Sequence, residues 1–396
     1  RHANPRLPPT PRTPPGRSRV RRWAAGLAVL LAAVVLAVFG PAGYSRWAKQ
    51  AAAERLQEGA ISEACRHLRQ AAWAAPRDGE IDLMSAFCDR QLRQVDRWQA
   101  ALQTARQKGV PQSQVDREKE LYRIQSGNWP DGTESRLASL AGEGMTTYDV
   151  PAAFVAGCLA SGRTALAEQL LNAWSADCPD DAHVATMRGR YWESLGDVRQ
   201  ARTNYEAAIA RSPRHELAHA ALAALFEQDD QLPQSLRQYA AIASTSPTSE
   251  IAAVGAARIL RKMGDLDRAQ AILDPFARAE EPPTKVAADM GRIAMERGDL
   301  AGAKRWFGRA GLERTYDVEL LMSAVRLEGI EGKSAEAEQT FQRIASLGDR
   351  VTRIRELRIR LAVDPRDSAA AEEAEKLQQS LQAEMDASES VPAKGA

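Results

Sequence analysis

Apolar and polar positions alternate along most of the chain with the spacing of short helices separated by polar turns. A turn residue recurs every 34 positions from residue 162 to 332, at Gly162, Gly196, Asp230, Gly264, Gly298 and Gly332. Five residues later comes a small residue, at Ala167, Ala201, Ser235, Ala269, Ala303 and Ala337. Four residues further comes a bulky one, at Leu171, Tyr205, Tyr239, Leu273, Phe307 and Phe341. Residues four apart share a helical face, so the pattern predicts a packed helix after every turn.

A second set of positions predicts where these helices meet and where they end. Seven residues before the turn stands a residue small enough to let two helices approach closely, at Gly189, Ala223, Ala257 and Gly291. Seventeen residues after the turn, a proline stops the second helix, at Pro179, Pro213 and Pro247. The sequence therefore predicts an all-α fold with six helix-turn-helix units over residues 148–351.

The 34-residue unit resembles the tetratricopeptide repeat, or TPR. The best window is 182–215, where the signature positions hold Gly189, Trp192, Gly196, Ala201, Tyr205, Ala208 and Pro213. Ala185 and Arg188 depart from the family pattern. The resemblance implies an α-solenoid of stacked hairpins with a concave surface that binds proteins, and it implies neither a cofactor nor a metal.

The rest of the chain divides around these repeats. Residues 45–147 are predicted to form divergent hairpins of the same kind, because Gly59, Ala64, Leu68, Ala71 and Pro76 repeat the pattern once. Further turns are expected near Arg93 and at residues 126–128. Residues 352–386 read as C-terminal capping helices with a solvated outer face. Residues 1–22, which are rich in proline and arginine, and residues 387–396 are predicted to be disordered.

Residues 23–44 are apolar over a length sufficient to cross a bilayer. Trp23 and Tyr44 stand at the two ends, where aromatic side chains favour the membrane interface. Residues 1–43 hold seven arginines and no acid, which predicts a cytoplasmic N-terminus and a repeat body on the extracytoplasmic side. A cleaved signal peptide is the alternative, since residues 40–42 form a passable cleavage site.

The charge and the cysteine content restrict the classes of partner and site that can be expected. With those seven arginines removed from the 53 basic residues, 46 remain against 52 acidic ones, so the body is mildly acidic and nucleic acid is not the expected partner. The cysteines are isolated, with no C-x-x-C pair, at Cys65, Cys88, Cys158 and Cys178. They are expected to be buried small apolar residues, while a disulfide stays open if the body is extracytoplasmic.

One short motif points to different chemistry. His215, Glu216 and His219 fit H-E-x-x-H, in which two histidines bind zinc beside a glutamate base. The same residues straddle the boundary between two repeats, two residues after Pro213, where the repeat phase alone predicts a helix start. We therefore expect a packed helix rather than a zinc hydrolase, and no enzyme activity.

The resemblance also places a set of cations. The ninth residue of a repeat faces the groove in the family, and this position holds Arg190, Arg258, Arg292 and Arg326. Arg261, Lys262 and Lys285 extend the set. Guanidinium groups suit carboxylates, so an acidic peptide segment is the implied ligand of a membrane-anchored interaction scaffold. The alternatives are arginines paired with Glu193, Glu227 and Glu296, and a structural subunit of an envelope assembly without a bound peptide.

Overall fold

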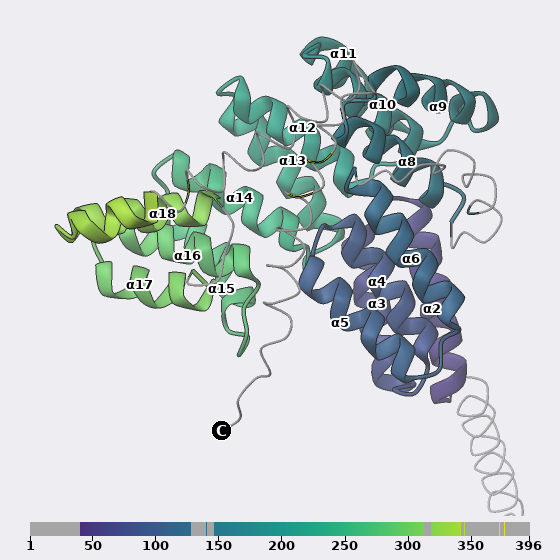
Figure 1. The fold of residues 1–396 in the computed structure, drawn as a ribbon, viewed down its shortest axis with the longest axis horizontal. Helices are drawn as coiled ribbons and strands as arrows, with labels where there is room; N and C mark the ends of the chain where they lie inside the picture. Colours follow the sequence, from purple (N-terminus) through teal and green to yellow (C-terminus); the bar gives the residue numbers. More distant parts are fainter. Residues whose placement is uncertain are drawn as a thin grey trace, which may run out of the picture. The chain divides into compact units, whose positions relative to one another are not determined.

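The structure is a computed structural model that describes residues 40–127, 140, 146–312, 318–341, 344, 372 and 376. Its residues divide into two compact units, residues 1–252 and 253–396, which are described separately. The described residues of both units form helices and turns, and none of them is in a strand (Figure 1). The all-α prediction is confirmed.

The helices of the first unit are short and similar in length. They are α2 (Pro41–Gln57), α3 (Ile61–Ala74), α4 (Gly79–Gln91), α5 (Val95–Gln107), α6 (Gln112–Gln125), α8 (Asp149–Ala160), α9 (Thr164–Asp177), α10 (Ala182–Ser194), α11 (Val198–Arg211), α12 (Glu216–Gln228) and α13 (Leu232–Thr245). Consecutive helices pack as hairpins, such as α2 with α3, α10 with α11 and α12 with α13.

The second unit continues the same arrangement. Its helices are α14 (Glu250–Lys262), which begins just before the division, α15 (Leu266–Ala277), α16 (Thr284–Glu296), α17 (Leu300–Arg309) and α18 (Val318–Ile330). Helices α16 and α17 form a hairpin, and α18 packs against α17.

The turn positions have the backbone conformation that favours glycine. Positive φ values occur at Gly162, Gly196, Gly264, Gly298 and Gly332, and at Asp230 in the slot without a glycine. Arg93 ends the turn between α4 and α5 with a φ of 56°. The second helices α9, α11 and α13 each end two residues before their proline.

The small and bulky positions make the core of each hairpin. A Cβ on Gly189 would lie 2.4 Å from the Tyr205 ring, and one on Gly291 would lie 2.5 Å from the Phe307 ring. Only glycine therefore lets these helices approach so closely. Phe341 differs, being 49% exposed.

The predicted membrane segment and tails lie largely outside the described residues. Of residues 23–44, only 40–44 are described, and they belong to the start of α2. No described helix is both long and apolar enough to span a bilayer. The leader 1–22, the capping segment 352–386 apart from Glu372 and Lys376, and the tail 387–396 are also outside the description.

The four cysteines are free thiols, and Cys88 and Cys158 are buried as expected, while Cys65 and Cys178 are half-buried. A hydrogen bond with Cys65, together with burial, raises the pKa of the Cys88 thiol.

Candidate functional site

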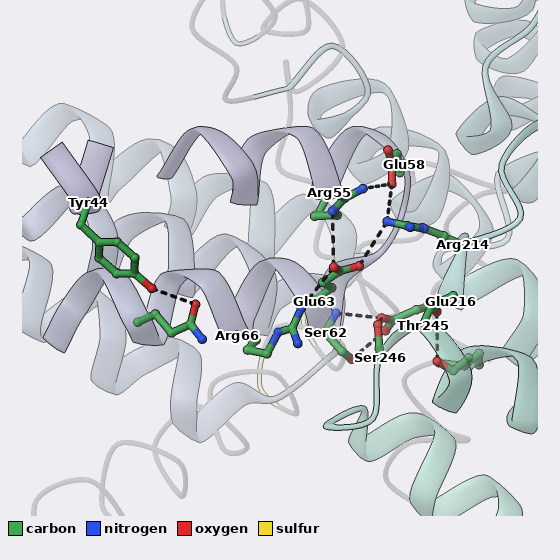
Figure 2. A network of polar contacts seen from close by, with 12 residues as sticks. Tyr44, Arg55, Glu58, Ser62, Glu63, Arg66, Arg214, Glu216, Thr245 and Ser246 are labelled. Carbon is green, nitrogen blue, oxygen red and sulfur yellow. Dashed lines mark hydrogen bonds and ion pairs between the residues drawn. The ribbon is translucent and has the colours of Figure 1, made fainter. Parts of the chain in front are cut away.

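The start of α12 contacts the first hairpin, 154 residues earlier in the chain (Figure 2). The buried Glu216 carboxylate accepts hydrogen bonds from Ser62 N at 3.0 Å, Ser62 Oγ at 2.7 Å and Ser246 Oγ at 2.9 Å. Burial raises the pKa of this carboxyl, and the bonds from Ser62 and Ser246 act against the rise. Glu216 therefore joins α3, α12 and the end of α13.

Backbone groups complete this junction. Glu216 N donates to Gly59 O at 3.1 Å, and Ser212 Oγ donates to Glu58 O at 2.6 Å. Arg214 Nη1 lies 3.6 Å from Glu58 Oε2 and 3.6 Å from Glu63 Oε2. Figure 2 shows these two ion pairs as dashed lines. The turn between α2 and α3 therefore contacts the boundary between α11 and α12.

Two buried histidines extend the junction toward α10. Ala218 N donates to His215 Nδ1 at 3.2 Å, so the proton of His215 is on Nε2, 3.0 Å from His183 Nδ1. His183 Nε2 in turn donates to Gln57 O at 3.2 Å. A backbone N–H can only donate and a carbonyl can only accept, so both rings are neutral in this chain of bonds. Burial lowers the pKa of both.

This geometry accounts for the H-E-x-x-H string. His219 Nδ1 lies 2.7 Å from Gln238 Oε1, and its Nε2 lies 3.1 Å from Pro213 O. All four ring nitrogens of His215 and His219 therefore have protein partners, and the Glu216 carboxylate accepts hydrogen bonds from Ser62 and Ser246. A zinc ligand needs a free nitrogen lone pair. The motif is used for packing, as the repeat phase predicts.

Beside the junction, a buried charge network connects α4, α6 and α8. Arg90 is 1% exposed and donates to Glu118 Oε1 at 2.6 Å and to Asp149. It also donates to Gln125 Oε1 at 2.7 Å. A buried arginine between two buried carboxylates fixes the positions of these three helices.

A pocket of about 440 Å³, part of it open to solvent, lies between this network and the histidines. Arg190, on α10, lines the pocket, together with His183 and His215. Of the seven cations singled out from the sequence, Arg190 alone belongs to the first unit.

The other six lie in the second unit. Arg292 Nη1 is 2.7 Å from Asp289 Oδ1, and its Nε donates to Ser323 Oγ at 3.0 Å. Arg261 Nη1 is 2.5 Å from Glu296 Oε1, a pairing weighed as the alternative. Burial raises the pKa of the Asp289 carboxyl, and Arg292, Arg261 and Arg258 lower it. These three arginines are called here the basic cluster; of the three, Arg292 forms an ion pair with Asp289.

The remaining cations are peripheral. Lys262, Lys285 and Arg326 are exposed on α14, α16 and α18. No arginine of the described residues forms an ion pair with Glu193; its carboxylate instead accepts a hydrogen bond from Tyr205 Oη at 2.7 Å.

Sequence reasoning missed Gln91, Tyr148 and His183, which lie on α4, at the N-cap of α8 and on α10. None of them is part of a motif. The only signal in the sequence was a polar residue at a position on the predicted buried face of a helix. That signal can be interpreted only when the stacking of the hairpins is known.

Comparison by sequence finds no matching family model and no matching curated protein. Among solved structures, PilF of Pseudomonas aeruginosa is 14% identical, with a TM-score of 0.41 over 59% of this chain and 96% of that one. PilW, a type IV pilus biogenesis factor, is 14% identical, with a TM-score of 0.43 over 51% and 93%. A tetratricopeptide repeat protein from Parabacteroides merdae is 14% identical, with a TM-score of 0.38 over 71% and 97%. Overlaps this loose say nothing about function, so the functional argument rests on the chain's own residues.

Proposed function

We propose that this protein is an interaction scaffold whose helical repeats bind an acidic segment of a partner protein. The observation that carries the proposal is the basic cluster, in which Arg292 pairs with the buried Asp289 and Arg261 pairs with the partly exposed Glu296. Glu319 also lies 3.8 Å from Arg292, so three carboxylates balance the three guanidinium groups, and only that of Asp289 is buried.

The outer pairings of this cluster are of the kind that a ligand replaces. Glu319 lies 3.8 Å from Arg292 and its side chain is 82% exposed. An ion pair this exposed contributes about 0–1 kcal/mol. A partner carboxylate can therefore take its place at little cost, and a guanidinium can hold it through two parallel hydrogen bonds.

The test uses the exposed cations, because their substitution leaves the buried contacts in place. The double variant Lys285→Glu with Arg326→Glu reverses two exposed charges on α16 and α18. The matched control is Lys304→Glu with Arg305→Glu, which reverses two exposed charges on α17. The measurement is fluorescence anisotropy of a labelled octaglutamate peptide, with octaglutamine as the neutral probe.

We expect octaglutamate to bind the wild type, to bind less tightly as salt rises, and to lose at least about fivefold in affinity with the double variant. Equal affinity for the double variant and its control would contradict the proposal. Absence of any octaglutamate binding would favour the alternative, a structural subunit of an envelope assembly.

We also propose that residues 23–44 tether this scaffold to a membrane, with the repeats on the extracytoplasmic side. The support is the apolar run with arginines on one flank. A chain beginning at residue 40 should leave the carbonate-resistant membrane fraction in which the full chain is found. Equal partition of both chains would refute the tether.

A further inference from the structure

The guanidinium of Arg190 has an unusual environment for a charge. Its one hydrogen-bond contact is with Met187 Sδ, at 4.0 Å, and no carboxylate of the described residues is within ion-pair distance of it. Burial lowers its pKa and the neighbouring Arg93 lowers it further, while Tyr205 and Glu193 raise it. A half-buried cation without an ion-pair partner is costly, and an anion in the adjoining pocket would reduce that cost.

Two neutral donors line the same pocket and are also unused. Among the described residues, Tyr148 Oη and Gln91 Nε2 are buried without a hydrogen-bond partner. Tyr148 is 2% exposed, and its ring is stacked on His183 with 3.5 Å between the centroids. Buried polar groups are nearly always paired, so two orphaned donors beside an unpaired guanidinium point to an absent acceptor.

The other polar groups of the pocket are already occupied. His183 and His215 use their ring nitrogens in the chain from Ala218 to Gln57. Gln125 accepts a hydrogen bond from Arg90, and Thr186 Oγ1 donates to Ala182 O at 2.8 Å. The rest of the wall is apolar, formed by Ile61, Ala152, Ala156, Met187 and Leu217.

We propose that this pocket, the Arg190 pocket, binds a carboxylate carried on a short apolar stem. Arg190 supplies the charge, Tyr148 and Gln91 supply neutral hydrogen bonds, and the apolar wall contacts the stem. One cation with two neutral donors suits a monoanion better than a phosphate dianion. The site lies in the first unit and does not depend on the basic cluster.

The carboxylate has two sources, a free short-chain acid or the C-terminus of a peptide. Isothermal titration of the full chain with butyrate, and with the tripeptide Ala-Ala-Leu, separates them. Butyramide and the amidated tripeptide are the uncharged counterparts, and inorganic phosphate tests the choice of anion. We expect saturable binding of at least one carboxylate and none of its amide.

The variants assign the binding to named side chains. Arg190→Met removes the charge at similar volume and is expected to weaken binding at least about tenfold, as for a charged hydrogen bond. Tyr148→Phe is expected to weaken it about two- to tenfold. Arg188→Met is the matched control, because Arg188 is on the same helix but bonds Asn172 at an exposed site, and its affinity should equal that of the wild type.

A second readout separates binding from a structural role. Without ligand, Arg190→Met should melt no lower than the wild type, because it removes an unpaired charge. If that variant does not fold, Tyr148→Phe decides, since it loses no hydrogen bond in the ligand-free protein. The proposal is overturned if neither carboxylate binds, if amides or phosphate bind equally well, or if Arg190→Met, or Tyr148→Phe in its place, binds like Arg188→Met.

Discussion

The contact between the first hairpin and α12 gives the sharpest prediction, through Gly59. This residue has a φ of 74°, and a Cβ on it would lie 2.4 Å from Cδ2 of the buried His215 ring. Gly196 occupies the equivalent turn of another hairpin with a φ of 79°, and a Cβ there would meet nothing within 4 Å. Gly196→Ala is therefore a matched control for the backbone conformation alone.

The magnitudes follow from these two environments. A left-handed conformation costs a residue other than glycine about 1–2 kcal/mol, which both alanine variants incur. Overpacking against a buried ring adds about 1–3 kcal/mol in Gly59→Ala alone. We expect Gly59→Ala to lose about 2–5 kcal/mol of unfolding free energy, against about 1–2 kcal/mol for Gly196→Ala.

Urea unfolding followed by circular dichroism measures the difference. Native-state hydrogen exchange locates it, because the amide of Glu216 donates to Gly59 O and should lose protection in Gly59→Ala only. If the two variants are equally stable and the Glu216 amide stays protected from hydrogen exchange, the turn of the first hairpin does not contact α12.

Three further predictions concern buried groups of the first unit. Because the pKa values of His183 and His215 are lowered in the folded protein, the unfolded chain binds more protons below about pH 6.5. Unfolding free energy that is present above this pH is therefore lost on acidification, by at most about 1.4 kcal/mol per pH unit for each ring. His215→Asn keeps a capping acceptor and should flatten the pH slope of unfolding free energy between pH 6.5 and 5.5; an unchanged slope would exclude the neutral pair. Arg90→Met leaves the buried Glu118 without a counter-ion and Asp149 with only Arg117, at 3.4 Å, and should cost about 3–5 kcal/mol in urea unfolding, whereas the exposed Arg97→Met should cost under about 1 kcal/mol. Similar costs would contradict the network. Gly189→Ala places a Cβ 2.4 Å from a tyrosine ring and should lower stability by about 1–3 kcal/mol; a melting temperature equal to the wild type would argue against the close helix approach.

Much of the fold was predictable because it is local. Turn glycines, the small residue at Gly189 and the bulky Tyr205 are all within one 34-residue unit, where helical periodicity determines which side chains meet. The same phase placed the start of α12 at Glu216 and so identified the zinc-like string as a packed helix start. A repeat length other than 34 residues would have placed these residues on the wrong helical faces.

The candidate site was not predictable to the same extent. Arg190 was identified from its position in the repeat, but its neighbours Gln91 and Tyr148 come from other hairpins and carry no motif. The basic cluster was partly anticipated, since Arg258 and Arg292 share a repeat position. Their common carboxylate, Asp289, was not, because nothing in the repeat marks it.

The sequence by itself determined the helices, their turns and the faces that pack within each hairpin, because those depend on residues a few positions apart. Only the tertiary structure decided that Ser62 meets Glu216, 154 residues away, and that Gly59 meets Glu216 and His215. That contact depends on the angle between successive hairpins, which accumulates over several repeats from many small packing differences. The pocket beside Arg190 exists for the same reason, since its walls come from helices that only the stacking of hairpins brings together.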